Sequence, residues 1–133
     1  MAYIALSHSN SVAGNIMGHL EQEELHSVSL DSRSRIISEG MIYKGTSVNS
    51  VNIRVGEIFR RAIRDNAASI IIAHNHPSGD SSPSLEDLSV TQEVVKAGKL
   101  LQVETLDHLI ITGTIYTGLK ARLGVWVNPL VRS

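Results

Sequence analysis

Hydrophobic and polar residues follow two different periods along the chain, which predicts a mixture of strands and helices. Residues 25–31 and 36–43 read as two strands joined by a short polar segment, and this arrangement predicts a β-hairpin. Residues 69–73 are rich in isoleucine and too short for a helix, so they predict a buried central strand that leads directly into a histidine. Alternation between residues 101 and 111 predicts one more strand or a pair of strands.

Three other segments place apolar residues at the spacing of one helical face. These segments cover residues 12–20, 58–66 and 85–98. Ser11 is a candidate N-cap for the first helix, and the apolar face of the second comprises Ile58, Phe59, Ala62 and Ile63. In the third helix we expect Leu85, Leu88 and Val95 to share one side and Gly98 to end the helix, because glycine commonly follows a last helical turn. Residues 45–52 read as a loop or an edge strand.

A chain of 133 residues and 14.4 kDa is the size of one domain, with a core that must be aliphatic because only 4% of residues are aromatic. We expect a helical lead-in over residues 1–22, the domain itself over 23–127 and a tail over 128–133. The longest strongly apolar stretch, residues 67–73, is far shorter than a membrane span, and no leader pattern opens the chain. We therefore expect a cytoplasmic protein that makes no membrane contact.

Charge and cysteine content narrow the chemistry. A formal net charge of -1 gives the whole molecule no general attraction for a polyanion, so nucleic acid is a disfavoured partner. The absence of cysteine excludes disulfides, thiolate metal sites, iron–sulfur clusters and cysteine nucleophiles. Any metal ion must be held by histidines and carboxylates.

The segment from His74 to Asp87 concentrates residues that could hold such an ion. His74 and His76 are two apart at the end of an extended strand, so their side chains point the same way. Asp87 falls in the first turn of the following helix, and the intervening loop, rich in proline, glycine and serine, can bring it back to the histidines. Two imidazoles and one carboxylate leave a fourth position open, as in a catalytic zinc site, where zinc lowers the pKa of a water to about 7.

The residues Ser84 and Asp87 can also be explained without a metal ion. Ser84 and Asp87 have the spacing of a capping box at a helix N-terminus, which explains both residues without an ion. The two readings are compatible, because a ligating carboxylate can also accept hydrogen bonds from backbone N–H groups.

The His-x-His-Pro run, followed by Ser84 and then Asp87, resembles the signature of the JAMM (JAB1/MPN) metalloenzymes. The segment HNHPSGD at residues 74–80, together with Leu-Asp-His at residues 106–108, is similar to the RadC branch of this family. The resemblance extends over residues 23–112. It implies an α+β type of α/β fold, a mixed β-sheet flanked by helices like that of JAMM and cytidine-deaminase-like metalloenzymes.

The resemblance also implies roles for individual residues. His74, His76 and Asp87 would be the ligands of one zinc ion per chain, and Ser84 would help to stabilise an oxyanion. An upstream glutamate would be the general base, and counting back from the strand end places the family position on Glu23.

Two other glutamates remain open as the general base. Glu24 is one residue away, and a register error of one residue would reverse its direction. Glu57 is the runner-up, although its place at the start of a helix is explained by dipole complementarity. Asp107 and His108 are neighbours on a predicted strand, so at most one of them can face the zinc.

These observations favour a zinc-dependent hydrolase of amide or isopeptide bonds, a metallopeptidase whose substrate and oligomeric state the sequence leaves open. One alternative is a nucleic-acid-associated module of the kind that the RadC name suggests, with Arg54, Arg60, Arg61 and Arg64 as candidate phosphate contacts. Arginines on a helix more often form a solvated face. A second alternative is a metal-free interaction domain on the same scaffold. The remaining histidines, at 8, 19 and 26, have no ligand partner at useful spacing.

Overall fold

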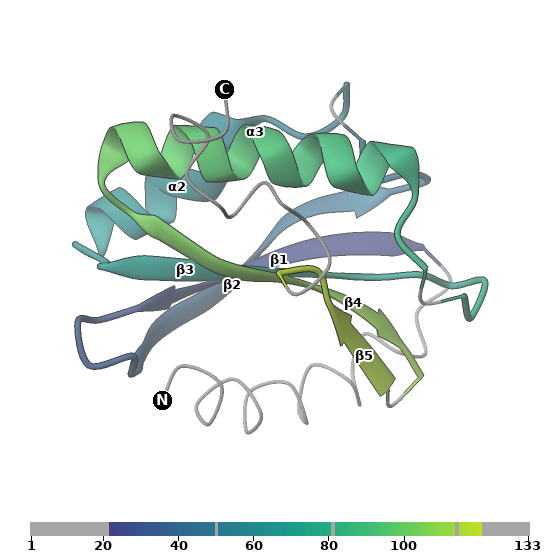
Figure 1. Ribbon diagram of the computed structural model, residues 1–133, viewed down its shortest axis with the longest axis horizontal. Coiled ribbons are helices and arrows are strands. Elements are labelled where there is room, and N and C mark those ends of the chain that lie inside the picture. Colours follow the sequence, from purple (N-terminus) through teal and green to yellow (C-terminus); the bar gives the residue numbers. More distant parts are fainter. Residues whose placement is uncertain (1–21, 50, 81, 114, 121–133) are drawn as a thin grey trace.

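In the part of the chain that the structure describes, five strands form one mixed sheet, and two helices lie together on one of its faces (Figure 1). The structure is a computed structural model that describes residues 22–49, 51–80, 82–113 and 115–120. Its elements are β1 (Glu23–Leu30), β2 (Ile36–Gly45), α2 (Val55–Arg64), β3 (Ser69–Asn75), α3 (Leu85–Leu101), β4 (Glu104–Thr112) and β5 (Ile115–Gly118). The predicted fold class, a mixed sheet with flanking helices, is confirmed.

The strand order is β2-β1-β3-β4-β5. β1 and β2 form the predicted antiparallel hairpin, and β1 also pairs antiparallel with β3. β3 and β4 are parallel, and α3 makes the long crossover that such a pair requires. Because β1 runs against β3, the beginning of β1 lies beside the end of β3, with Leu25 opposite His74.

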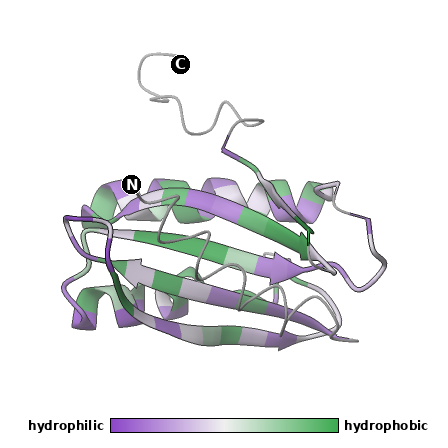
Figure 2. Cartoon of the chain, turned by 90° about the horizontal axis from the view of Figure 1, so that it is seen from below, coloured by the Kyte–Doolittle hydropathy of each residue, from purple (hydrophilic) through white to green (hydrophobic). Residues whose placement is uncertain are grey.

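Alternate residues of the sheet enter two separate cores. On the helix face, residues such as Leu25, Ile70 and Ile72 pack with the apolar sides of α2 and α3. On the opposite face a second cluster comprises Val28, Leu30, Ile71, Ala73, Leu109 and Ile111. Figure 2, in which the sheet is seen from the side opposite the helices, shows long hydrophobic stretches along the middle strands. Every residue of β3 is buried, which explains why the sequence shows an apolar run there instead of alternation.

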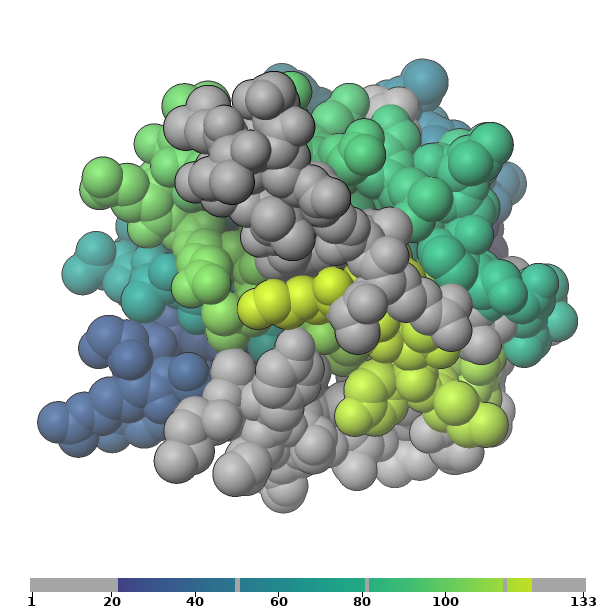
Figure 3. Space-filling view, viewed as in Figure 1, coloured from purple at the N-terminus to yellow at the C-terminus, as the bar shows by residue number. Residues whose placement is uncertain are grey.

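Helix α3 begins at Leu85 as predicted, but its end and the exposure of Leu85 differ from the prediction. Gly98 does not end it: the helix continues to Leu101, and the chain leaves through Gln102, whose φ of 59° is left-handed. Leu85, expected on the buried side, is 82% exposed. Gly98 is instead buried where α3 approaches the start of β4, since a Cβ atom there would lie 2.4 Å from the carbonyl oxygen of Val103. In Figure 3 the green atoms of the later part of α3 lie at the upper left and the teal atoms of its beginning at the upper right, above the yellow to yellow-green atoms of β5.

Smaller differences concern the segments around α2. Residues 46–49 form no strand, so the loop reading of this stretch is the right one. Ile63, expected on the apolar face of α2, is 57% exposed, whereas Ile58, Phe59 and Ala62 are buried as expected. The N-terminal helix with Ser11, the histidines at 8 and 19, and the tail lie outside the described residues. No helix within the described ranges is long and apolar enough to cross a membrane.

The contact at Gly98 generates a stability prediction. Gly98→Ala should lower the free energy of unfolding by about 1–3 kcal/mol, because the new methyl group would clash with the backbone of Val103, just before β4. Gly56→Ala is the matched control: it also lies in a helix, but a Cβ atom there meets nothing within 4 Å, so stability should be unchanged or raised by up to about 1 kcal/mol. Urea unfolding of both variants measures the difference, and equal stabilities would contradict the close approach.

Candidate metal centre

The end of β3 and the beginning of β1 supply three of the site's side chains. His74 follows Ile70 and Ile72 on the helix face of β3 and is completely buried. His76 lies just past the strand, where its backbone N–H donates to the carbonyl oxygen of Ile111 at 3.0 Å and so keeps the chain beside β4. Glu23 is the first residue of β1, which pairs antiparallel with the end of β3.

The first turn of α3 supplies a carboxylate whose orientation is fixed by the helix cap. The predicted capping box is present: the Ser84 hydroxyl accepts from the Asp87 N–H at 3.0 Å, and Asp87 Oδ2 accepts from the Ser84 N–H at 2.7 Å. Asp87 is 1% exposed. Its carboxylate is therefore both a helix cap and a buried acceptor that faces the sheet.

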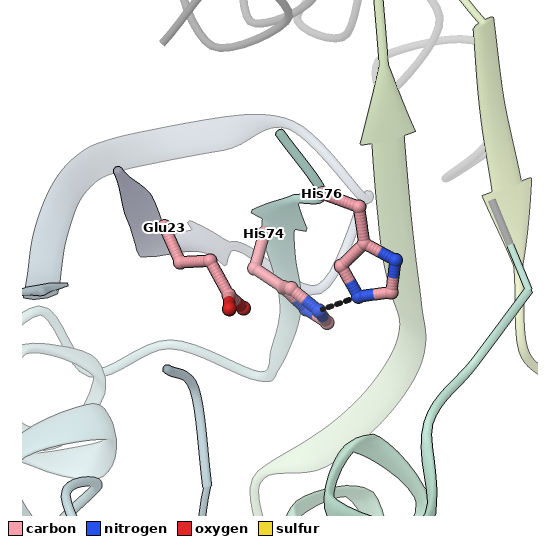
Figure 4. A group of neighbouring side chains, drawn as sticks. All are labelled: Glu23, His74 and His76. Atoms are coloured by element: carbon pink, nitrogen blue, oxygen red, sulfur yellow. Dashed lines mark hydrogen bonds between the residues drawn. The ribbon is translucent and has the colours of Figure 1, made fainter. Parts of the chain in front are cut away.

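These residues meet at one point. His74 Nε2 lies 3.0 Å from Asp87 Oδ1, His76 Nε2 lies 3.0 Å from Asp87 Oδ2, and the two Nε2 atoms are 3.0 Å apart. A carboxylate oxygen of Glu23 and the two imidazole nitrogens all lie within 4.8 Å of one another. Figure 4 shows the Glu23 carboxylate directed toward the two histidine rings.

The donor set fits a cation. The outer nitrogen of His76, Nδ1, lies 2.8 Å from the carbonyl oxygen of Asp80, which can only accept, so Nδ1 carries the proton and Nε2 of the neutral ring has a lone pair. This lone pair, His74 Nε2 and the Asp87 carboxylate converge. Two ligands that are each about 2.1 Å from one tetrahedral ion lie about 3.4 Å apart, so donor spacings of 3.0 Å come close to that geometry.

The close contact between Asp87 and the histidines also shifts the pKa values of Asp87 and His76. Burial alone would raise the pKa of Asp87, but the two adjacent histidine rings and the hydrogen bond from the Ser84 N–H together hold that pKa well below its usual range. The hydrogen bond to Asp87 raises the pKa of His76, against the opposing effect of desolvation. Without a metal ion, a proton on His76 therefore competes for the position that a cation would take.

Behind His74 lies a buried hydrogen-bond chain that the sequence did not reveal as a unit. His74 Nδ1 is 2.7 Å from His108 Nε2, His108 Nδ1 is 2.5 Å from Thr91 Oγ1, and Thr91 Oγ1 is 2.7 Å from the Asp87 carbonyl oxygen. Burial holds the pKa of His108 well below its usual value. The strand argument had allowed one of Asp107 and His108 to reach the site, and it is His108. Thr91 had no signal beyond its four-residue spacing from Asp87.

Strand alternation separates the candidate glutamates. Glu23 shares the helix face of β1 with Leu25, whereas the Glu24 side chain bonds His26 Nε2 at 2.8 Å and lies 4.0 Å from Lys44 Nζ. Glu57 is on α2 and approaches Arg60 to 3.8 Å. Of these three glutamates, only Glu23 lies next to His74 and His76.

The site opens into a cleft of about 580 Å³. Its lining combines both predicted catalytic residues, Glu23 and Ser84, with residues of the loop after β2 and of the segment after β3, including Thr46, Ser47, Val48, His76, Pro77 and Ser78. The arginines of α2 line a different and smaller cavity of about 230 Å³ with Met41 and Ile42, so they take no part in this cleft.

Comparison with known proteins agrees with this picture. A family described as "RadC-like JAB domain" matches residues 6–125. A UPF0758 protein of Chloroflexus aurantiacus is 48% identical over 106 residues, covering 80% of this chain and 46% of the relative. UPF0758 proteins of Roseiflexus castenholzii and Clostridium perfringens are 43% and 41% identical over 113 and 125 residues, or 85% and 92% of this chain and 48% and 55% of the relatives. The chain thus spans about half the length of the curated relatives it matches, and their names state no activity.

The cap geometry generates a second prediction. Ser84→Ala should lower the free energy of unfolding by about 1 kcal/mol, because the Asp87 N–H loses its acceptor. Ser89→Ala makes the same substitution inside α3, away from the cap, and should leave stability within about 0.5 kcal/mol of the unaltered protein. Thermal unfolding of the two variants without metal measures both values. Equal losses would mean that Ser84 does not cap the helix.

Proposed function

Because the chain belongs to the RadC-like JAB domain family, we propose that it binds one zinc ion through His74, His76 and Asp87 and hydrolyses amide or isopeptide bonds. The observation that carries this proposal is the convergence of three acceptors, 3.0 Å apart, beside the Glu23 carboxylate at an open cleft. Zinc held there would supply Lewis acidity and a water of lowered pKa. The remaining chemistry falls to the side chains of the chain itself.

Glu23 is the proposed proton shuttle. The backbone N–H of Val48 donates to its Oε1 at 3.3 Å, which orients the carboxylate. Glu23 accepts the proton of the attacking water and then delivers it to the leaving amine, as a general base and acid. Glu23 needs no place among the three ligands for this role, since it lies beside their donor atoms.

Ser84 is the proposed oxyanion donor. Its oxygen accepts from the Asp87 N–H, so the hydroxyl hydrogen is left to donate into the cleft that Ser84 lines. A hydroxyl positioned in this way stabilises the negative charge that develops on a carbonyl oxygen during attack. The helix cap thus gives the same side chain a fixed position and a free donor.

The cleft favours an extended peptide or isopeptide segment as substrate. Its hydroxyl and backbone groups, from Thr46, Ser47 and Ser78, offer hydrogen bonds to a main chain. Val48 and Pro77 offer apolar contact to its side chains. A lining of this kind combines orientation by a few polar groups with non-specific burial.

Metal analysis tests the ligand assignment. Protein purified without added zinc should contain close to one zinc per chain, and His76→Ala should lose most of it because one of three ligands is missing. His26→Ala is the matched control: His26 lies on β1, is bonded to Glu24 and should retain the metal. Full zinc content in His76→Ala would refute the assignment.

Substitution of the glutamates tests the reaction. Glu23→Gln should keep zinc and fold but lower turnover of quenched-fluorescent peptide and isopeptide libraries by about 10²–10⁴-fold, the usual contribution of a general base. Glu24→Gln, one residue along β1, should retain turnover because its side chain is bonded to His26, away from the cleft. If the zinc-loaded protein cleaves no library member faster than Glu23→Gln, it is not an amide hydrolase of this kind.

A further inference from the structure

We propose that Thr91 and His108 are positioning residues that fix the proton of His74 on Nδ1 and thereby present the Nε2 lone pair of His74 to the metal ion. The inference rests on the proposed metal site but not on the proposed hydrolysis. Its basis is the direction in which each hydrogen bond of the buried chain must run.

The direction begins at Thr91. Its hydroxyl lies 2.7 Å from the carbonyl oxygen of Asp87, one helical turn earlier in α3. A carbonyl oxygen can only accept, and a hydroxyl has one hydrogen, so the hydrogen of Thr91 is used in this bond. Toward every other partner Thr91 Oγ1 is an acceptor.

His108 donates a hydrogen bond to Thr91 and accepts one from His74. Its Nδ1 lies 2.5 Å from Thr91 Oγ1, so Nδ1 must be the protonated nitrogen that donates. The ring is completely buried, which disfavours a second proton and leaves Nε2 with a lone pair. His108 Nε2 in turn lies 2.7 Å from His74 Nδ1 and can only accept from it.

His74 therefore has its proton on Nδ1 and an unprotonated Nε2. That nitrogen faces Asp87 Oδ1 and His76 Nε2, both at 3.0 Å and both acceptors. Three acceptors that face one another are mutually repulsive unless a cation or a proton lies between them. Metal-ligating histidines commonly donate their outer N–H to a carboxylate or carbonyl. Here the acceptor is a second imidazole, and its ability to accept depends on Thr91.

The hydrogen-bond chain forms where the buried side of α3 faces strands β3 and β4. Asp87 and Thr91 are four residues apart on the buried side of α3. His108 pairs with Ile72 in the parallel β3–β4 ladder and so lies on the helix face, next to His74. The series of contacts begins and ends at Asp87: its carbonyl oxygen accepts from Thr91, and its carboxylate faces His74.

The first test reads the tautomer directly in the metal-free protein. Long-range ¹H–¹⁵N correlation spectra, recorded at alkaline pH where imidazoles are neutral, should show a protonated Nδ1 and an unprotonated Nε2 for His74. Thr91→Val has nearly the same shape but no hydroxyl, and the spectrum should then show loss of this single tautomer. Thr91→Ser keeps the hydroxyl and should keep the tautomer. A His74 protonated on Nε2 in the unaltered protein would overturn the proposal.

The second test measures zinc affinity by competition with a chromophoric chelator. Thr91→Val should weaken zinc binding by about 10–100-fold, the usual effect of losing an outer partner of a ligand, and Thr91→Ser should bind close to normally. Equal affinities for Thr91→Val and the unaltered protein would contradict the proposal.

A pair of variants at His108 keeps the question decidable if Thr91→Val does not fold. His108→Gln offers an amide oxygen to His74 and an amide N–H to Thr91, so it should retain more zinc affinity than His108→Leu. Equal affinities for these two variants would count against the relay. If the unaltered protein binds no zinc, the proposed function fails, and the His74 tautomer in the metal-free spectrum still decides this inference.

Discussion

A carboxylate that is 1% exposed must be compensated, and the arrangement around Asp87 is built on that requirement. Its Oδ2 accepts the Ser84 N–H at the start of α3 and also faces His76, and its Oδ1 faces His74. The same residue's carbonyl oxygen accepts from Thr91. Asp87 therefore makes polar contacts both within α3 and with the two histidines at the end of β3, in addition to the apolar packing between helix and sheet.

The sheet order supplies the rest of the site. β3 lies between an antiparallel and a parallel neighbour, so the beginning of β1 and the later part of β4 both lie beside its end. Glu23 comes from the first and the buried ring of His108 from the second. The site therefore has one side at the cleft, which Glu23 lines, and one side in the protein interior, where His108 is completely buried.

Much of this arrangement could be predicted from local patterns. Strand alternation was enough to place His74 and His76 together, and helix-cap spacing was enough to orient Asp87. Gly98 was misjudged because a glycine's local preference for a helix end cannot reveal that the backbone of Val103 and the side chains of Thr105 and Phe59 approach it closely. Thr91 was missed for a similar reason: its role depends on which strand lies beside β3, and periodicity does not contain that information.

The central claim is that His74, His76 and Asp87 hold one metal ion, and X-ray absorption of the zinc-loaded protein tests it most directly. We expect a four-coordinate zinc with two imidazole nitrogens and two oxygens, all at about 2.0–2.2 Å. A six-oxygen shell without the scattering pattern of imidazole rings would contradict the claim, because zinc would then be bound outside the two histidines.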